Sequence, residues 1–321
     1  MKGGLRTGDI VQVRSASEIA ATLGADGTLD HLPFMPEMLD YCGRRFKVLR
    51  RAEKSCVELA PTKYQFREFH HNDVVILDTL RCSGAAHDGC GRGCILFWKS
   101  VWLRKVDSLQ APITIDESAQ ERPASLLKTK VDTNRYFCQS TELAKSTHEM
   151  SRGRKLMKCV YEVQSGSRGL LEMVWQVVRA LWNKPFYERR WPSLVGPLTR
   201  TPVGNLQLQP GETVRIKPVK EILQTLDRNG LNRGLRCDLA MCSYEGRTYR
   251  VRNRLDRMIV EGTGQMREVQ GTVILEHLEC HCLTAMGGCP RQDFQYWREV
   301  WLERTEVSNG TPIEVEKAAC R

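Results

Sequence analysis

A cluster of soft metal ligands stands between Leu80 and Leu103, in the sequence LRCSGAAHDGCGRGCILFWKSVWL. Thiolate sulfur and imidazole nitrogen are the ligands that zinc prefers in structural sites, usually four to an ion. Four glycines within the same loop would let the backbone wrap around a small ion. We therefore predict a closed zinc site here, with Cys56 as a rival ligand from another strand. The four residues of the loop have the spacing C-x4-H-x2-C-x3-C and are Cys82, His87, Cys90 and Cys94.

Three other interpretations of this loop stay open. Three or four thiolates could hold an iron–sulfur cluster, although the spacing matches no common ferredoxin pattern. Cys90 and Cys94 could exchange a disulfide, although C-x3-C differs from the C-x2-C of thioredoxin-like redox sites. Cysteines that follow buried strands could also be small core residues, since a free cysteine behaves as a small hydrophobe.

A similar loop returns near the C-terminus, within LECHCLTAMGGCPRQDFQYWREVWL. Two of its cysteines align with Cys82 and Cys90, whereas Asp293 replaces Cys94. Adjacent residues seldom point to one centre, so this second candidate metal site is the weaker of the two. Its ligands would be Cys280, His281, Cys282 and Cys289.

The two loops belong to a repeat of about 100 residues. Gly8–Arg51 aligns with Gly211–Arg254 at a constant offset of 203 positions, and fourteen of the 44 pairs are identical. The match resumes downstream, where VILDTLRC aligns with VILEHLEC and WKSVWLRK with WREVWLER. Three collinear blocks indicate an internal duplication. LPFMPEM in the first unit becomes LRCDLAM in the second, so any role of Glu37 is confined to the first.

Each unit contains the signals of short strands with one helical insertion. GDIVQVRS alternates apolar and polar residues, as a half-buried strand does. Ser15 and Glu18 have the spacing of a capping box, so a short helix is expected to follow. Trp98 and Trp102, like Trp297 and Trp301, are expected in the core. We predict a mainly β protein with some α: two tandem SH3-like small β-barrels joined by a helical middle segment.

The order G-D-x-V-x-V followed by M-x-x-Y-x-G-x-x-F-x-V resembles SH3-like barrels of the KOW or nitrile-hydratase-β kind. The two units together resemble a family of uncharacterised bacterial proteins more closely. That resemblance is carried by GDIVQVRSASEIAATL, LPFMPEMLDYCGRRFKV and LRCSGAAHDGCGRGCILFWKSVWLRKV, and it covers about two thirds of the chain. It implies a bacterial source and no particular activity.

The predicted layout has four parts: a first barrel over 1–109, a linker and helical segment over 110–210, a second barrel over 211–306, and a disordered tail over 307–321. The middle segment reads as two helices broken at SGSRG. In the second helix Leu170, Val174 and Leu181 fall along one face. We expect this face to pack between the barrels; a membrane-surface helix and a docking site for a partner are the alternatives.

The chain carries a formal net charge of +10, which permits a polyanionic partner. Basic residues stand at strand spacing in both units, so nucleic-acid binding is an alternative function. Few aromatic residues accompany them, which argues against single-strand binding. The residues concerned are Arg44, Arg45, Lys47, Arg50, Arg51, Arg247 and Arg250.

No common catalytic motif occurs in the sequence, which favours a protein that is not an enzyme. The N-terminus lacks the apolar stretch of a secretory signal, and no apolar run is long enough for a transmembrane helix. We therefore expect a cytoplasmic protein, in a compartment where clustered cysteines bind metal more often than they form disulfides. The sequence favours a zinc-stabilised binding or accessory protein, with another protein as the expected partner.

Overall fold

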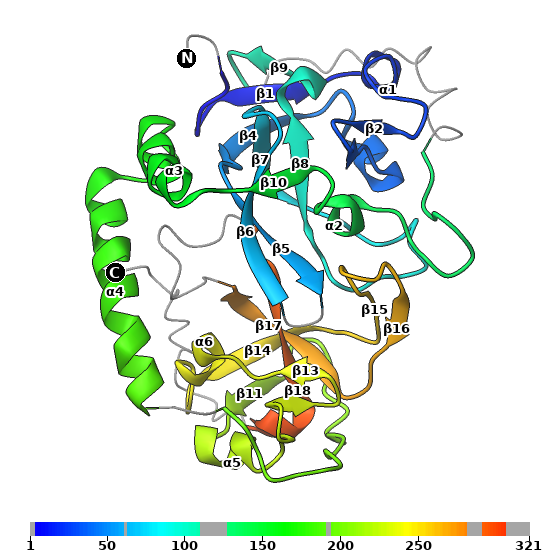
Figure 1. Ribbon diagram of the computed structural model, residues 1–321. Helices are drawn as coiled ribbons and strands as arrows, with labels where there is room; N and C mark the ends of the chain where they lie inside the picture. The colour runs from blue at the N-terminus through cyan, green and yellow to red at the C-terminus, as the bar shows by residue number, and fades with distance from the viewer. Residues whose placement is uncertain (1–3, 61–62, 110–126, 191–193, 281–290, 306–321) are drawn as a thin grey trace. The chain divides into compact units, whose positions relative to one another are not determined.

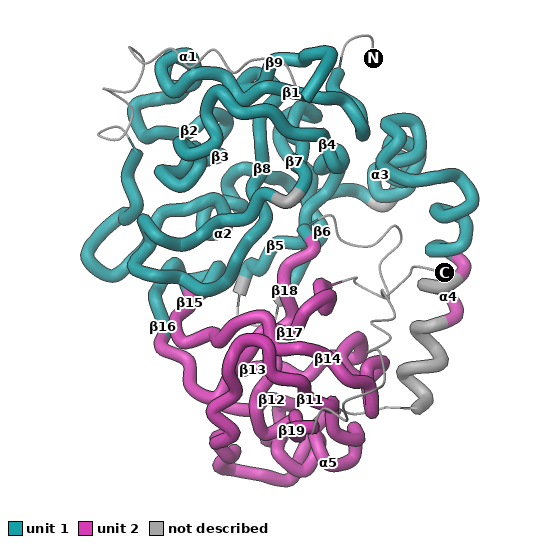
Figure 2. Tube along the Cα trace, turned by 180° about the vertical axis from the view of Figure 1, so that it is seen from behind, with its two compact units in different colours: residues 1–177, 259–267, 289–291 teal, residues 178–258, 268–288, 292–321 magenta. Residues whose placement is uncertain are grey.

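A computed structural model describes residues 4–60, 63–109, 127–190, 194–280 and 291–305. Strands make up 34% and helices 21% of the structure, which confirms the predicted mainly β class with some α. The chain divides into two compact units (Figure 2). Unit 1 comprises residues 1–177, 259–267 and 289–291, and unit 2 comprises the rest. A short piece of the second predicted repeat therefore belongs to unit 1.

Unit 1 is built on a five-stranded antiparallel sheet with the order β8-β7-β4-β1-β9. The sheet forms because each strand carries apolar residues toward one core; Val11 and Val13, for example, stand on either side of Gln12 and are fully buried. A 3-10 helix, η2 (Ser100–Trp102), joins β8 to β9. The strands are β1 (Ile10–Val13), β4 (Arg45–Arg51), β7 (Val74–Arg81), β8 (Ile95–Lys99) and β9 (Leu103–Val106).

Unit 2 contains a second five-stranded sheet with the equivalent order β18-β17-β14-β11-β19. A 3-10 helix, η5 (Glu299–Trp301), joins β18 to β19 in the same way. Both sheets also have an irregularity of register at the equivalent place. In unit 1 it lies where β4 pairs with β7, between Val48 and Arg50, and in unit 2 where β14 pairs with β17, between Val251 and Asn253. The strands are β11 (Thr213–Ile216), β14 (Thr248–Arg254), β17 (Thr272–Glu279), β18 (Phe294–Arg298) and β19 (Leu302–Arg304).

Four short elements, two helices and two strands, follow the first strand of each sheet. Helix α1 begins after Ser15, whose side chain and that of Glu18 form the predicted capping box. A two-stranded hairpin and a second short helix complete the insertion (Figure 1). In unit 1 these elements are α1 (Ala16–Ala20), β2 (Thr28–Leu29), β3 (Leu32–Pro33) and η1 (Pro36–Tyr41). In unit 2 they are α5 (Val219–Leu223), β12 (Leu231–Asn232), β13 (Leu235–Arg236) and α6 (Leu239–Cys242).

A hairpin separates the second and third strands of each sheet. In unit 1 its strands β5 (Ser55–Ala60) and β6 (Lys63–Phe69) extend to a three-stranded sheet, because β10 (Thr147–Glu149) pairs with β6. The corresponding hairpin of the second repeat consists of β15 (Arg257–Ile259) and β16 (Met266–Glu268). Its tip, Ile259–Arg267, belongs to unit 1. There Tyr136 donates its backbone N–H to the carbonyl of Gly264 over 2.7 Å.

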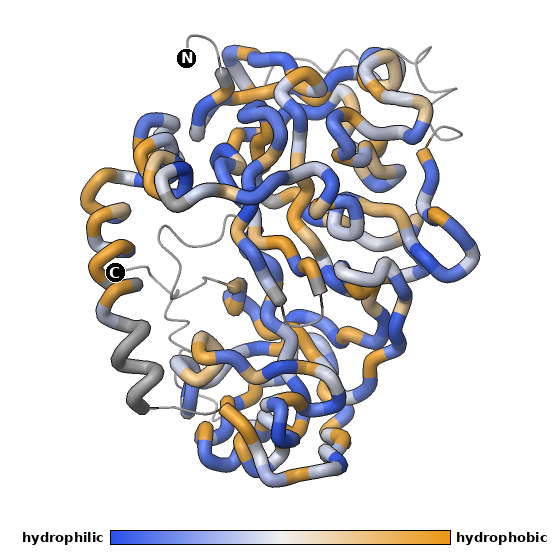
Figure 3. The backbone as a smooth tube through the Cα atoms, in the orientation of Figure 1, coloured by the Kyte–Doolittle hydropathy of each residue, from blue (hydrophilic) through white to orange (hydrophobic). Residues whose placement is uncertain are grey.

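Three helices occupy the middle of the chain: α2 (Gln139–Glu142), α3 (Arg152–Gln164) and α4 (Leu170–Arg190). The break between α3 and α4 falls at the predicted SGSRG. In the described part of the chain, none of the helices combines the length and the apolar character needed to cross a bilayer. Leu170, Val174 and Leu181 of the apolar face predicted on the second helix (Figure 3) are exposed, and its packing between the barrels stays a prediction.

The core of each unit is organised around two tryptophans. Trp98 and Trp102 in unit 1, like Trp297 and Trp301 in unit 2, have no exposed surface, which confirms their predicted place in the core. Two equivalent hydrogen bonds fix the indoles at the ends of the 3-10 helices. Trp102 donates its Nε1–H to the hydroxyl of Thr22 over 3.0 Å, and Trp301 donates to Thr225 over 2.9 Å.

Removing either hydroxyl acceptor should destabilise the protein. Thr22→Val and Thr225→Val keep the side-chain volume but leave a buried indole N–H without its partner, which costs about 1–3 kcal/mol. Urea unfolding should show a loss of this size in both variants. Thr133→Val, at an exposed position, is the control and should change stability little. Unaltered stability of both core variants would contradict this role of the hydroxyls.

Candidate metal centre

The loop between β7 and β8 carries the predicted ligands and closes on itself. Cys82 donates its backbone N–H to the carbonyl of Cys94 over 2.8 Å, so the loop begins and ends at the same point of the sheet. Gly84 makes the tight return: its φ is +72°, and a Cβ there would stand 2.0 Å from the carbonyl oxygen of Cys90. A glycine is therefore required at position 84. This agrees with the prediction that the glycines let the backbone of this loop wrap tightly.

Three ligand-type side chains meet at the base of this loop. Nδ1 of His87 lies 2.6 Å from Oε1 of Glu37, and Sγ of Cys82 lies 3.8 Å from the same oxygen. The three ligand atoms all lie within 4.8 Å of one another. Cys82 and His87 were predicted as ligands. Glu37 was not predicted as a ligand, because it lies on η1, about 50 residues before His87. The sequence offered one sign of its role, which is that only the first repeat has a glutamate at this position.

The far side of the His87 ring is fixed by the backbone. Nε2 lies 3.1 Å from the carbonyl oxygen of Phe137, which can only accept a hydrogen bond, so Nε2 carries a hydrogen. Metal-ligating histidines almost always donate their second N–H to a carbonyl or carboxylate in this way. The ring is therefore oriented with Nδ1 toward Glu37 and Cys82, as a ligand to an ion would be.

Burial and charge control the protons of this group. Burial by itself lowers the pKa of His87, but the hydrogen bond and the charge of Glu37 raise it above its ordinary value. Burial by itself raises the pKa of Glu37, but the hydrogen bond to His87 outweighs burial, so the pKa lies below its ordinary value. Burial, with the nearby Glu37 carboxylate, raises the pKa of the Cys82 thiol. Without a metal, the group thus holds a carboxylate, an imidazolium and a neutral thiol.

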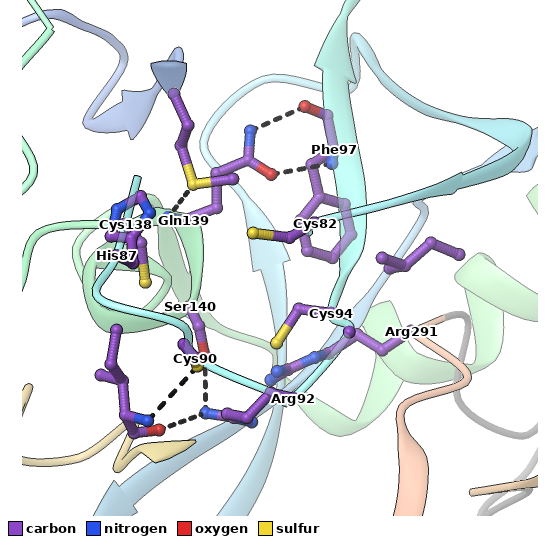
Figure 4. A pocket seen from close by; sticks show the side chains of 14 residues that line it. Cys82, His87, Cys90, Arg92, Cys94, Phe97, Cys138, Gln139, Ser140 and Arg291 are labelled. Carbon is purple, nitrogen blue, oxygen red and sulfur yellow. Dashed lines mark hydrogen bonds between the residues drawn. The ribbon is translucent and has the colours of Figure 1, made fainter. Parts of the chain in front are cut away.

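A small cavity of about 30 Å³ adjoins these side chains (Figure 4). It has room for an ion or one or two waters. The ten cysteines in the described part of the chain are all free thiols, and four of them line this cavity. Cys138, the residue immediately before α2, was not predicted as part of the site. The four are Cys82, Cys90, Cys94 and Cys138.

Two predicted ligands have other surroundings. Sγ of Cys90 accepts the backbone N–H of Ile259 over 3.4 Å, so this thiol holds the tip of the β15–β16 hairpin although it also lines the cavity. Cys56 lies on β5 and is not among the described residues that line the cavity. The geometry therefore brings Cys82 and His87 together with Glu37, and Cys94 also lines the cavity.

A buried charge cluster stands beside the cavity. Both carboxylate oxygens of Glu261 accept hydrogen bonds from Arg291, over 3.0 and 2.8 Å. Arg92, from the cysteine loop, lies 3.4 Å from Glu261 and donates to the carbonyl of Ile259 over 3.1 Å. Burial acts to raise the pKa of Glu261, but Arg291 above all lowers it, to about 2. Sequence reasoning missed this cluster, because its members lie up to 199 positions apart.

The second candidate metal set can be located only in part. Cys280 donates its backbone N–H to the carbonyl of Asp293 over 2.7 Å, which is the same closure as in the first loop. His281, Cys282 and Cys289 lie outside the described residues, so this site stays a prediction. Ala240 stands where the first repeat has Glu37.

The basic residues predicted for nucleic-acid binding do not share one environment. Arg51 is buried, bonds to Glu53 over 2.8 Å and so cannot contact a phosphate. Arg45 donates to the carbonyl of Ser108 over 2.8 Å, and the guanidinium of Arg44 lies over the ring of Tyr41. Arg50 is partly buried. Lys47, Arg247 and Arg250 are exposed, and nucleic-acid binding through them stays a prediction.

Comparison with known proteins adds no relative: no family model, no curated protein and no solved structure matches the chain. The residues of the site itself therefore carry the functional inference.

The Glu261 cluster should make the protein sensitive to acid. The folded-state pKa of Glu261 lies below its ordinary value of 4.5, so its contribution is complete above that pH and is lost as the pH falls toward 2. A pKa lowered from 4.5 to about 2 corresponds to about 3 kcal/mol. Glu261→Gln should remove this acid-dependent loss and, at neutral pH, cost about 3–5 kcal/mol because two buried arginines lose their anion.

Urea unfolding across this pH range measures both effects. Glu303→Gln is the control, since it breaks an exposed ion pair with Arg215 and should change stability by less than about 1 kcal/mol. If Glu261→Gln and the wild type lost stability equally in acid, Glu261 would not be the group responsible.

Proposed function

We propose that the protein is a zinc-binding tandem-barrel protein that serves as a binding or accessory module, with the ion held by Glu37, Cys82 and His87. The observation that carries this proposal is the meeting of three ligand atoms of different chemistry within 4.8 Å, beside a cavity of ionic size. Zinc accepts oxygen, nitrogen and sulfur ligands together, usually in a four-coordinate arrangement.

The fourth position would be taken by a thiolate from the cavity wall or by water. Cys94 and Cys138 both line the cavity, so either could complete a closed structural site. An open position with water would instead be the arrangement of catalytic zinc sites. The cysteines in the cavity wall favour the closed form, because they offer a fourth protein ligand.

An iron–sulfur cluster is the second candidate, and the four cysteines around the cavity favour it. Two features count against it. The group closest together contains a carboxylate and an imidazole, which are not the usual cluster ligands. Cys90 accepts a backbone hydrogen bond from Ile259 rather than standing ready as a ligand.

The sheets support the proposed SH3-like architecture. In each, the fifth strand pairs with the first, the first with the second, the second with the third and the third with the fourth, and a 3-10 helix joins the fourth to the fifth. Small barrels of this kind present their loops to partners. The cysteine loop of unit 1 joins the third and fourth strands, so a bound ion would fix the conformation of one such loop.

Zinc content tests the proposal directly. Protein purified without oxygen should contain about one zinc per chain at this site and show no visible absorbance. Cys82→Ser and His87→Gln should each lose that zinc and unfold at lower temperature, because a structural ion contributes its binding free energy to folding. Cys159→Ser is the matched control, since this thiol is buried on α3 and does not line the cavity. Elemental analysis with thermal unfolding gives both readouts.

Two results would contradict the zinc proposal. Iron with inorganic sulfide and a brown absorbance would establish the iron–sulfur alternative. A fully stable wild type without metal, unaffected by added zinc, would leave the cysteines as core residues.

Zinc binding should also release protons and strengthen as the pH rises. The metal-free group holds one proton on the Cys82 thiol, whose pKa burial raises, and one on Nδ1 of His87, whose pKa Glu37 raises. A zinc ion must displace both before it can use these ligand atoms. Calorimetric titrations in two buffers of different ionisation enthalpy should reveal about two protons released from these groups, and about one more if a thiolate of Cys94 or Cys138 fills the fourth position. A zinc affinity that does not depend on pH would contradict this assignment of protons.

A further inference from the structure

Two cysteines of the metal loop stand opposite each other where the loop leaves the sheet. Strands β7 and β8 are antiparallel, and the last pair in their register is Arg81 with Ile95. One position further, Cys82 donates its backbone N–H to the carbonyl of Cys94 over 2.8 Å. Cys82 and Cys94 are therefore the next opposed pair of this ladder, just beyond the ends of the two strands.

The ladder brings these two residues to the distance at which a disulfide can form. Opposed residues that a backbone hydrogen bond joins have Cα atoms about 5.5 Å apart, and their side chains lie on the same face of the ladder. A disulfide bridges Cα atoms that are about 4.4–6.8 Å apart. Cys82 and Cys94 also line the same small cavity (Figure 4). Their thiols can therefore approach each other without a rearrangement of the sheet.

These two thiols differ in exposure from the other cysteines of the cavity. Cys90 and Cys138 are buried, whereas Cys82 and Cys94 are partly exposed. Cys90 is also engaged at the hairpin tip, where its sulfur accepts the backbone N–H of Ile259. Hydrogen peroxide is hardly larger than the waters for which the cavity has room, so it can reach the pair Cys82 and Cys94.

The second repeat has the same backbone closure without a second cysteine. Cys280 donates its backbone N–H to the carbonyl of Asp293 over 2.7 Å, next to the pair of Glu279 with Phe294. No disulfide can form at this place in unit 2, because Asp293 stands where the first repeat has Cys94. The opposed cysteines thus occur in the repeat that carries the metal group.

We propose that Cys82 and Cys94 form a reversible disulfide when the protein meets a peroxide, and that this disulfide expels the metal ion. The disulfide follows from the pairing of the strands alone, whereas the expulsion of the ion rests on the zinc site proposed above. A cysteine binds metal as a thiolate, so Sγ of Cys82 is lost as a ligand once it is bonded to another sulfur.

The reaction consumes one molecule of hydrogen peroxide for each disulfide. One thiol of the pair attacks a peroxide oxygen, the O–O bond breaks, and a sulfenic acid and one water are formed. The other thiol then attacks the sulfenic sulfur, which forms the S–S bond and releases a second water. The two sulfur atoms lose two electrons in total, and the peroxide gains them. If zinc holds Cys82 as a thiolate, one proton from the solvent completes the balance.

The place of the pair in the ladder makes the disulfide easy to reduce. Opposed residues joined by a hydrogen bond have Cβ atoms about 5.5 Å apart, whereas a relaxed disulfide holds its Cβ atoms about 3.8 Å apart. Closing the bond must therefore draw the two strand ends together. A disulfide that departs from the relaxed geometry is reduced more readily by thiols, which makes the exchange reversible.

Peptide mapping after oxidation tests the proposal. Protein purified without oxygen is treated with hydrogen peroxide, the remaining thiols are alkylated, and trypsin then cuts after Arg81, Arg92 and Lys99. The wild type should yield peptide 82–92 linked to peptide 93–99, and dithiothreitol should separate them. Zinc released into a chromogenic chelator should rise with the amount of linked peptide, up to one ion for each disulfide.

Two variants decide which thiol is linked, because peptide 82–92 contains Cys90 as well as Cys82. Cys90→Ser should form the linked peptides as readily as the wild type, whereas Cys82→Ser should form about tenfold less of them or fewer. Cys138→Ser is the matched control, since this thiol lines the cavity but is not opposed to Cys94 in the ladder. Fragmentation of the linked wild-type peptides locates the bonded cysteine independently of the variants.

Three results would overturn the proposal. The wild type could form no linked peptide at peroxide concentrations that oxidise its other thiols. The link could run through Cys90 and persist at full yield in Cys82→Ser. Protein that carries the disulfide could retain all of its zinc, which would refute the expulsion of the ion. Failure of the zinc proposal looks different: the purified protein would hold no zinc, and the link between Cys82 and Cys94 would still form.

Discussion

The contact between Glu37 and His87 is the constraint on which the rest of the site depends. Both side chains are buried, and a buried carboxylate is very costly unless a positive group or hydrogen-bond donors meet it. The imidazole can meet it only if η1 carries Glu37 under the loop, if Gly84 allows the loop to return, and if the Phe137 carbonyl holds the ring. Three parts of unit 1, far apart in the sequence, are therefore fixed by one buried pair.

The same rule explains the other buried charges of unit 1. Glu261 is placed between two arginines, and Lys158 between two glutamates. Each of these groups ties a peripheral segment to the sheet: Glu261 the tip of the β15–β16 hairpin, and Lys158 the helix α3. In unit 2 the position of Glu37 is taken by Ala240, so this unit, whose sheet has the same strand order, lacks the anion that Cys82 and His87 meet in unit 1.

Local features of the fold could be predicted from the sequence, and contacts between distant segments could not. The capping box at Ser15 and the buried tryptophans follow from residue type and spacing alone. Glu37 joins the site through η1, and no spacing within the loop reveals it. Helix α3 shows the same limit, because its inward side is held by the ion pairs of Lys158 with Glu53 and Glu68, whose positions lie about 100 residues earlier.

Charge balance gives a reason why this site can exist with and without an ion. In the metal-free group, the carboxylate of Glu37 is balanced by the imidazolium of His87, and the Cys82 thiol is neutral, so the total charge is zero. In the proposed zinc state the divalent ion would be balanced by the Glu37 carboxylate and the Cys82 thiolate, with His87 neutral, so the total over the ion and these three residues would again be zero. Exchange of a zinc ion for the two protons would therefore leave the charge of this group unchanged, which limits the electrostatic cost in the protein interior. A thiolate of Cys94 or Cys138 in the fourth position would add one negative charge, and a water molecule would add none.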